Sequence, residues 1–272
     1  NSLFRLVRLG SFSDIIKRER KMKVIVSENA QQLGKKAAEL TAQYLREAIA
    51  EKGSARIILS TGASQFTTLE ALVKEDVDWS KVEMFHLDEY VNLPQDHPAS
   101  FVRYLKERFV EKTGGLKAVH FVDTSIGTDA IIEKLTGELK EAVVDVGLIG
   151  IGENAHVAFN DPPADFENQA SYIVVQLDAD CRKQQLGEGW FPTIDDVPRQ
   201  AVSMTVSQIL KCIHIISAVP YAVKASAIKK TLENDVTNRI PATVLKTHPS
   251  VTVFVDEDSA STVDREVLEQ YL

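Results

Sequence analysis

The alternation of strand-like and helix-like patterns along this 272-residue chain predicts an α/β fold with a mostly parallel central sheet. Two further observations support this class. The strand candidates are continuous apolar runs, as expected for strands covered on both faces. Several of them end in loops rich in glycine and polar residues, where parallel sheets hold their ligands. No repeat, low-complexity tract or long linker divides the chain, so we expect one domain over residues 23–272 after a basic extension over residues 1–22.

The elements are expected in alternating order. Apolar runs bounded by turn residues predict strands at residues 23–27, 56–59, 82–87, 143–149, 172–177, 213–218 and 251–255. Apolar residues at helical spacing predict helices near residues 30–45, 65–73, 101–110, 131–143, 178–186 and 221–231. Ser100 supports the start at residue 101, because serine is a favoured residue just before a helix.

Composition excludes several classes of function. A hydrophobic content of 44% and a charged content of 26% are ordinary for a globular protein. The net charge of −8 leaves no basic surplus for nucleic acid. No apolar run approaches the ~18–20 residues of a membrane span. Cys181 and Cys212 lie far apart, which favours free buried thiols in a reducing compartment and a cytoplasmic location.

The first candidate site loop is Ser60-Thr61-Gly62-Ala63-Ser64, between a predicted strand and a predicted helix. Gly62 allows the backbone to approach a ligand closely, and the hydroxyl groups are suited to a phosphate. The loop is not a nucleotide-binding P-loop, because no Gly-Lys-Ser/Thr follows it. Ser64 also fits a plain helix cap.

The second candidate is His86-Leu87-Asp88-Glu89-Tyr90 at the end of a predicted strand. Strand alternation would place His86 and Asp88 on one face at the edge of the sheet. A solvated turn explains two neighbouring carboxylates equally well.

The third and most informative segment starts at Gly150-Ile151-Gly152 and presents Glu153, Asn154, His156 and Asp161 within nine residues. A histidine near a carboxylate is the usual means of moving protons near neutral pH. The glycines formally match a dinucleotide fingerprint, but residues 159–163 contain two prolines and cannot continue the required helix. We therefore expect no nicotinamide cofactor.

Two weaker candidates remain. Lys224 starts a predicted helix directly after a strand and is placed to reach an anion as a point charge. Residues 182–191 combine two glycines with two aromatic residues, which fits either a mobile lid or an ordinary packed loop. A metal site built from His86, Asp88, His156 and Asp161 has permissible ligand types without diagnostic spacing, so no metal is expected.

Together these motifs resemble the glucosamine-6-phosphate deaminase family. The resemblance is carried by the following motifs, in this order: Thr61-Gly62, Leu87-Asp88-Glu89-Tyr90, Gly150-Ile151-Gly152, His156-Val157-Ala158-Phe159-Asn160 and Lys224. It covers nearly the whole predicted domain. It implies a modified Rossmann-like fold with helices on both faces of the sheet, no organic cofactor and a homo-oligomer. It also implies deamination and isomerisation of a phosphorylated amino sugar, most simply glucosamine 6-phosphate to fructose 6-phosphate and ammonia.

The resemblance also assigns roles. Asp88 would move a proton between C2 and C1 of the sugar, and His156, supported by Asp161 and Asn154, would open the sugar ring. Ser60, Thr61, Gly62, Ala63, Ser64 and Lys224 would bind the phosphate, with Gly150 and Gly152 at the substrate.

The sequence departs from the family pattern at three places. Asp161 stands where glutamate is common, and Asn154 stands where some members have aspartate. The phosphate-binding arginine has no clean counterpart, although Arg182 is a candidate. The alternatives are a 6-phosphogluconolactonase-like hydrolase, another phosphosugar isomerase, or a sugar-phosphate sensor without catalysis.

Overall fold

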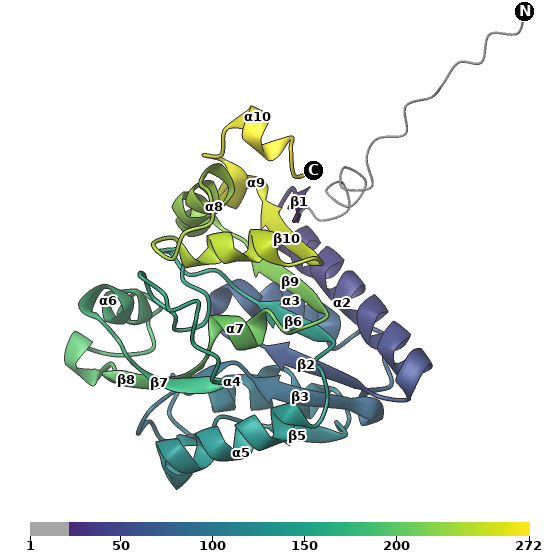
Figure 1. Cartoon of the computed structure of the whole chain (residues 1–272), viewed down its shortest axis with the longest axis vertical. Coiled ribbons are helices and arrows are strands. Elements are labelled where there is room, and N and C mark those ends of the chain that lie inside the picture. The colour runs from purple at the N-terminus through teal and green to yellow at the C-terminus, as the bar shows by residue number, and fades with distance from the viewer. Residues whose placement is uncertain (1–21) are drawn as a thin grey trace, which may run out of the picture.

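The structure is a computed structural model and describes residues 22–272. Seven parallel strands form the main sheet, in the order β1-β10-β9-β6-β2-β3-β5 (Figure 1). Their bounds are β1 Lys23–Ser27, β2 Ala55–Leu59, β3 Val82–His86, β5 Ala118–His120, β6 Val146–Ile149, β9 His214–Val219 and β10 Val251–Asp256. The predicted fold class is confirmed.

Helices cover both faces of this sheet, because its strands alternate apolar side chains between two cores. In β2, Ile57 and Leu59 belong to one hydrophobic cluster and Ile58 to the other. The first cluster is closed by α2 Ala30–Lys52, α3 Phe66–Leu72 and α4 Phe101–Arg108. The second is closed by α5 Thr128–Lys140, α7 Val206–Ile209, α8 Ala225–Glu233 and α9 Glu257–Ala260.

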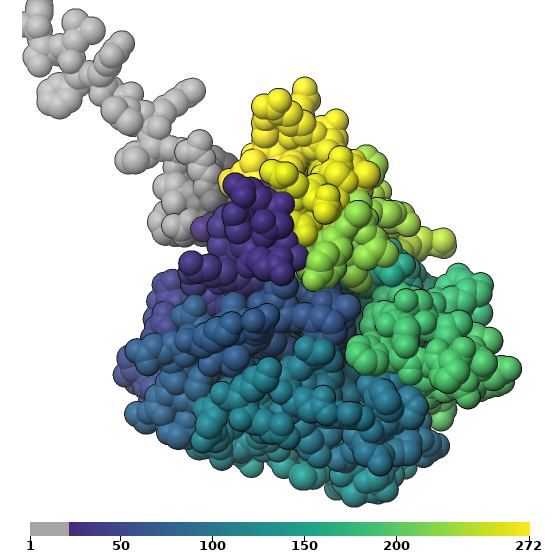
Figure 2. Space-filling view, turned by 180° about the vertical axis from the view of Figure 1, so that it is seen from behind, coloured from purple at the N-terminus to yellow at the C-terminus, as the bar shows by residue number. Residues whose placement is uncertain are grey.

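The ends of the described chain lie side by side. β1 pairs with β10, and the Val24 amide donates to the Tyr271 carbonyl at 2.8 Å, next to the short helix α10 Arg265–Leu268. Figure 2 shows this as purple atoms beside yellow ones. The predicted extension lies outside the described residues except for Met22, which is buried in the core.

A second, antiparallel sheet of three strands was not predicted. It contains β4 Asp88–Tyr90, β8 Gln200–Met204 and β7 Tyr172–Gln176, in the order β4-β8-β7. The predicted strand over residues 82–87 therefore ends one residue early. Leu87 joins the two sheets: its amide donates to Leu59 in the main sheet, and its carbonyl accepts from Met204 in the small one. This junction places Asp88 just beyond the edge of the main sheet.

The order of the strands creates a switch point between β2 and β6. The chain builds β2, β3 and β5 outward in one direction, and it builds β6, β9 and β10 outward in the other. Leu59 is opposite His86 on one side and Leu148 on the other, so the loops that follow these strands emerge at one edge. Ligands of open α/β sheets bind at such points.

Helix α6 Ala179–Gly187 packs outside the main sheet, next to β7 and β8 (Figure 1). The Asp178 carboxylate caps it by accepting from the Cys181 amide at 2.8 Å. No helix among residues 22–272 is both long enough and apolar enough to cross a membrane.

Candidate functional site

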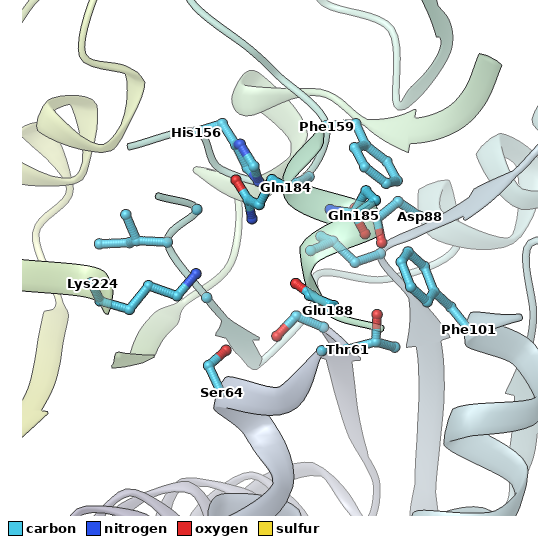
Figure 3. A pocket seen from close by; sticks show the side chains of 17 residues that line it. Thr61, Ser64, Asp88, Phe101, His156, Phe159, Gln184, Gln185, Glu188 and Lys224 are labelled. Atoms are coloured by element: carbon cyan, nitrogen blue, oxygen red, sulfur yellow. The ribbon is translucent and has the colours of Figure 1, made fainter. Parts of the chain in front are cut away.

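A narrow pocket lies at the switch point, and helix α6 closes it from outside (Figure 3). It encloses about 70 Å³ and shares Ser64, Gln184, Glu188 and Lys224 with a wider outer cavity of about 760 Å³. The inner pocket is lined by Ser60, Thr61, Gly62, Ser64, Leu87, Asp88, Phe101, Gly150, Ile151, Gly152, His156, Ala158, Phe159, Gln184, Gln185, Glu188 and Lys224.

The loop over residues 60–64 follows β2 and forms one wall of this pocket. Gly62 has φ 99°, a conformation that residues with a side chain rarely adopt, and the Tyr104 hydroxyl donates to its carbonyl at 2.8 Å. The Ser60 hydroxyl is buried and has no hydrogen-bond partner among the described residues. An orphaned buried hydroxyl in a pocket wall indicates a ligand. Ala63, predicted at the same site, lines only the outer cavity.

Lys224 extends into the pocket from the opposite side (Figure 3). It ends the short 3-10 helix Ala222–Lys224 that leads into α8, and only 8% of it is exposed. No carboxylate of residues 22–272 forms an ion pair with its ammonium group. Burial lowers the pKa of Lys224, although the charges of Glu188 and Glu153 oppose this shift. A buried ammonium without an ion-pair partner is suited to an anionic ligand.

Asp88 is buried at the pocket wall with 6% exposure. Burial raises its pKa from 3.8 to about 8, with a smaller contribution from the charge of Glu89. Glu89 points to the other side of the strand. Its carboxylate accepts from the Ser100 hydroxyl and the Val102 amide, both at 2.9 Å, at the start of α4. Asp88 is therefore free for a ligand, whereas Glu89 holds a helix in place.

His156 faces the pocket with one ring nitrogen and the protein with the other. Its Nδ1 lies 2.7 Å from Asn154 Oδ1 and 3.2 Å from Asp161 Oδ1, and Asn154 Nδ2 donates to the same Asp161 oxygen at 3.1 Å. Since both neighbours of Nδ1 are oxygen acceptors, Nδ1 carries the proton and Nε2 is left as a base. Burial raises the pKa of Asp161, but the hydrogen bond and charge of His156 and the hydrogen bond from Asn154 together outweigh it, so the net pKa is lowered.

Backbone geometry fixes the direction of the imidazole. Ala155 and Ala158 flank the histidine with φ 67° and φ 51°, which are uncommon values for alanine. A Cβ on Gly152 would lie 2.2 Å from the His156 ring, so only glycine fits there. Gly150 is less constrained, with the nearest atom to such a Cβ being Gln65 Nε2 at 3.1 Å. Residues 150–171 contain no helix, as the two prolines predicted.

Two candidates lie elsewhere. His86 is fully buried beside Phe121, and its Nδ1 accepts from the Val122 amide at 3.3 Å. The prediction that it shares a face with Asp88 at the sheet edge is wrong, because the chain changes sheets at Leu87. Arg182 donates to the carbonyls of Val197 and Ile194 and does not line the pocket. The part of the chain that the structure describes holds no cluster of three or more metal-ligating side chains.

Sequence analysis marked residues 182–191 as a lid or a packed loop, but it did not predict which of their side chains line the pocket. Gln184, Gln185 and Glu188 extend from this helix and its end into the pocket (Figure 3). Burial raises the pKa of Glu188, opposed by the charges of Lys224 and His156. Glu188 lies one helical turn beyond Gln184 and Gln185, and this spacing could have placed the three side chains on one side of a helix. Nothing in the sequence showed which side of the helix faces the strand ends.

These features define an α/β protein with a pocket at the carboxyl ends of its strands that is suited to a small anionic ligand, with Asp88 and His156 in its wall. The chain belongs to the family described as glucosamine-6-phosphate isomerases/6-phosphogluconolactonase, whose model matches residues 28–254.

Two relatives named glucosamine-6-phosphate deaminase are similar over most of the chain. The one from Thermoanaerobacter pseudethanolicus is 31% identical, covering 92% of this chain and 98% of the relative. The one from Halothermothrix orenii is 34% identical, covering 88% and 99%.

Solved structures show the same fold. A protein described as a monomeric glucosamine-6-phosphate deaminase superposes with a TM-score of 0.79 at 29% identity, covering 88% of this chain and 99% of that one. The 6-phosphogluconolactonase of Trypanosoma brucei has a TM-score of 0.72 at 16% identity, covering 90% and 99%. At that identity the second likeness shows the fold alone.

Proposed function

We propose that this chain catalyses the hydrolytic deamination and isomerisation of an amino-sugar 6-phosphate, with glucosamine 6-phosphate as the first candidate, to fructose 6-phosphate and ammonia. One observation carries the proposal. A single pocket holds a carboxyl group with a raised pKa, an imidazole with a free Nε2, and an anion-binding wall. The named relatives support the choice of an amino sugar.

Phosphate binding comes first in the proposed mechanism. The phosphate is held by Lys224 and by the hydroxyl groups of Ser60, Thr61 and Ser64, which line one end of the pocket. Holding this remote group orients C1 and C2 of the sugar toward Asp88 and His156, and converts binding into orientation at the reacting carbons.

Ring opening follows. His156 Nε2 takes the proton of the anomeric hydroxyl and returns it to the ring oxygen. The contacts of Nδ1 with Asn154 and Asp161 stabilise the charged imidazole formed in between. Asp161 is one methylene shorter than the glutamate common in the family, and it still reaches His156 at 3.2 Å.

Isomerisation and deamination complete the reaction. The Asp88 carboxylate removes the proton from C2 and delivers it to C1, and this leaves an imine at C2. Water hydrolyses the imine and releases ammonia. The raised pKa of Asp88 suits it to proton transfer near neutral pH.

Release of ammonium is the direct test. The protein is assayed with glucosamine 6-phosphate, galactosamine 6-phosphate, glucose 6-phosphate and 6-phosphogluconolactone, and ammonium and fructose 6-phosphate are measured in parallel. We expect equal amounts of both products from an amino sugar and no lactone hydrolysis. Lactone hydrolysis alone would support the hydrolase alternative, and binding without turnover would support a sensor.

The His156→Gln variant separates the two proton-transfer steps. We expect a larger loss with the closed sugar than with an open-chain analogue, because only the closed sugar needs ring opening. Equal losses on both substrates would contradict this role.

Two further properties remain predictions. The homo-oligomer implied by the resemblance is to be measured by light scattering, since one solved relative is described as monomeric. A cytoplasmic location is consistent with two free buried thiols, Cys181 and Cys212.

A further inference from the structure

Gln185 presents a hydrogen-bond donor to the pocket. Its side chain lies in the pocket wall with 6% exposure. The Tyr90 hydroxyl donates to Gln185 Oε1 at 2.6 Å, and no described residue accepts a hydrogen bond from Nε2. A carboxamide whose oxygen is held in this way offers its amino group to a ligand.

Strand β4 places this donor on the side of Asp88. Successive side chains of a strand point to opposite faces, so Asp88 and Tyr90 share one face while Glu89 points to α4. Figure 3 shows Gln185 next to Asp88, with Phe101 and Phe159 nearby and Lys224 on the far side of the pocket. The amide therefore lies at the end of the pocket where carbon chemistry is proposed, away from the phosphate wall.

Tyr90, which holds the Gln185 amide, is itself held in place by aromatic packing. The ring of Tyr90 packs against Phe101, Phe159 and Phe191 at centroid distances of 4.9, 5.7 and 5.5 Å. Burial raises the pKa of Tyr90 well above its ordinary value, so the phenol remains a donor. With its hydroxyl donating, Tyr90 holds Gln185 Oε1 and directs Nε2 away from itself.

Gln184 is held differently. Its Oε1 accepts from the Glu153 amide at 3.3 Å, and it lies beside His156 rather than Asp88 (Figure 3). The two neighbouring carboxamides thus face different ends of the acid–base pair, and only Gln185 lies at the end of the pocket that holds Asp88.

We propose that Gln185 donates through Nε2 to the oxygen on C1 of the substrate, and that Tyr90 is a positioning residue that fixes this donor. The inference rests on the proposed function. When Asp88 removes the C2 proton, the electron pair of the C–H bond forms a C1–C2 double bond. The electron pair of the C1 carbonyl moves onto its oxygen, which then takes a proton from solvent.

The donor would act at the moment when the C1 oxygen carries charge. Asp88 next delivers its proton to C1, the double bond shifts to C2 and nitrogen, and water hydrolyses the imine. A fixed donor aimed at a developing oxyanion lowers the barrier more than it strengthens ground-state binding. Loss of this donor is therefore expected to reduce kcat more than it raises KM.

Three variants and one control test the inference. Gln185→Glu keeps the shape of the side chain and replaces the donor by an acceptor. Gln185→Leu removes both the donor and the acceptor. Tyr90→Phe removes the hydroxyl that donates to Gln185 Oε1. We expect kcat for ammonium release to fall by ~100-fold or more in the two Gln185 variants, with KM changing less than about threefold. Tyr271→Phe is the control. It removes a comparable hydrogen bond, from the Tyr271 hydroxyl to the Leu232 carbonyl at 3.2 Å, at a place outside the pocket lining, and it should retain full activity.

A double-mutant cycle distinguishes positioning from mere packing. Since Tyr90 is proposed to act through Gln185, adding Tyr90→Phe to Gln185→Leu should lower kcat little further. If the two residues had independent structural roles, the losses of the two single variants would add in the double variant. Additive losses would overturn the positioning role. Circular dichroism on each variant identifies any that fails to fold, in which case the remaining Gln185 variant decides.

Two outcomes separate this inference from the function on which it rests. A wild-type protein that releases no ammonium from any amino-sugar phosphate overturns both. An active wild type together with a folded Gln185→Glu variant that retains kcat within twofold overturns the inference alone.

Discussion

Asp88 shows at the scale of one residue how burial sets a working pH. Its pKa is raised from 3.8 to about 8, mainly by burial, so at pH 6 the carboxyl is almost fully protonated. A proton-transfer base works only when ionised. We therefore expect kcat/KM to rise with pH between pH 6 and 8 and to level off above about pH 8, as measured by ammonium release. A profile that is flat over this range would contradict the assignment.

The same group affects stability in the opposite direction. An unfolded chain ionises Asp88 above pH 3.8, whereas the folded chain keeps the proton to about pH 8, so the folded state binds more protons between these values. Stability is therefore lost as pH rises through this window. Asp88→Asn should raise the free energy of unfolding by about 1–3 kcal/mol at pH 8, less than the full shift because the amide must itself be desolvated.

Denaturant unfolding of Asp88→Asn and wild type at pH 4 and pH 8 checks this expectation. The difference should be much smaller at pH 4, because that pH lies close to the unfolded-state pKa of 3.8 and the unfolded chain gains little from ionisation there. The same variant should lose exchange of the C2 proton with solvent. An equal stability difference at both pH values would show that packing, rather than ionisation, determines it.

Gly152 tests how closely the backbone approaches His156. A Cβ at this position would lie 2.2–2.4 Å from three atoms of the imidazole ring, so Gly152→Ala must displace the ring from the pocket. We expect at least a ~100-fold loss of kcat/KM, because a displacement of about 1 Å at a catalytic group has this effect. Gly137→Ala is the matched control, since its Cβ meets nothing within 4 Å.

At the scale of elements, glycine substitutions at the end of α6 test whether this helix must move during turnover. The two glycines at its end differ. Gly187 is the last residue of the helix, and a Cβ there would meet nothing within 4 Å, whereas Gly189 lies just beyond the helix with φ 84°. Gly187→Ala should stabilise the segment by about 0.5–1 kcal/mol, and Gly189→Ala should destabilise it by about 1 kcal/mol. Amide hydrogen exchange of residues 179–189 measures both changes. If α6 must open to admit substrate, the two variants should change kcat in opposite directions, because one stabilises the closed segment and the other destabilises it.

The elements also show what a sequence reveals. Strands such as β2 and β6 were predicted because both faces are buried and the apolar run is continuous. β5 and β4 have only three residues each, and β8 carries two polar side chains, so none produced a pattern. The polar loops after β2 and β6 were found because glycine and polar residues interrupt apolar runs. Gln185 was missed as a site residue because its role depends on Tyr90, which is distant in sequence.

At the scale of the molecule, the site depends on an order of strands that periodicity does not encode. β2 and β6 are neighbours in the sheet, but their paired residues lie far apart in the chain, as Arg56 and Asp145 show with a separation of 89 residues. Only this pairing brings the Ser60 loop next to the Gly150 turn. The convergence of the site was therefore expected from the family resemblance, and local patterns supplied only its parts.

Because the pocket joins segments from across the chain, an anionic ligand should stabilise the whole fold. A ligand present at 100 times its Kd raises the free energy of unfolding by about 2.7 kcal/mol. We expect fructose 6-phosphate to raise the melting temperature by several degrees. Lys224→Met should abolish the shift by removing the buried cation, and Glu188→Gln should enlarge it by removing a carboxylate that opposes the phosphate. Glucose without phosphate is the control. A shift that persists in Lys224→Met would place the phosphate outside this pocket.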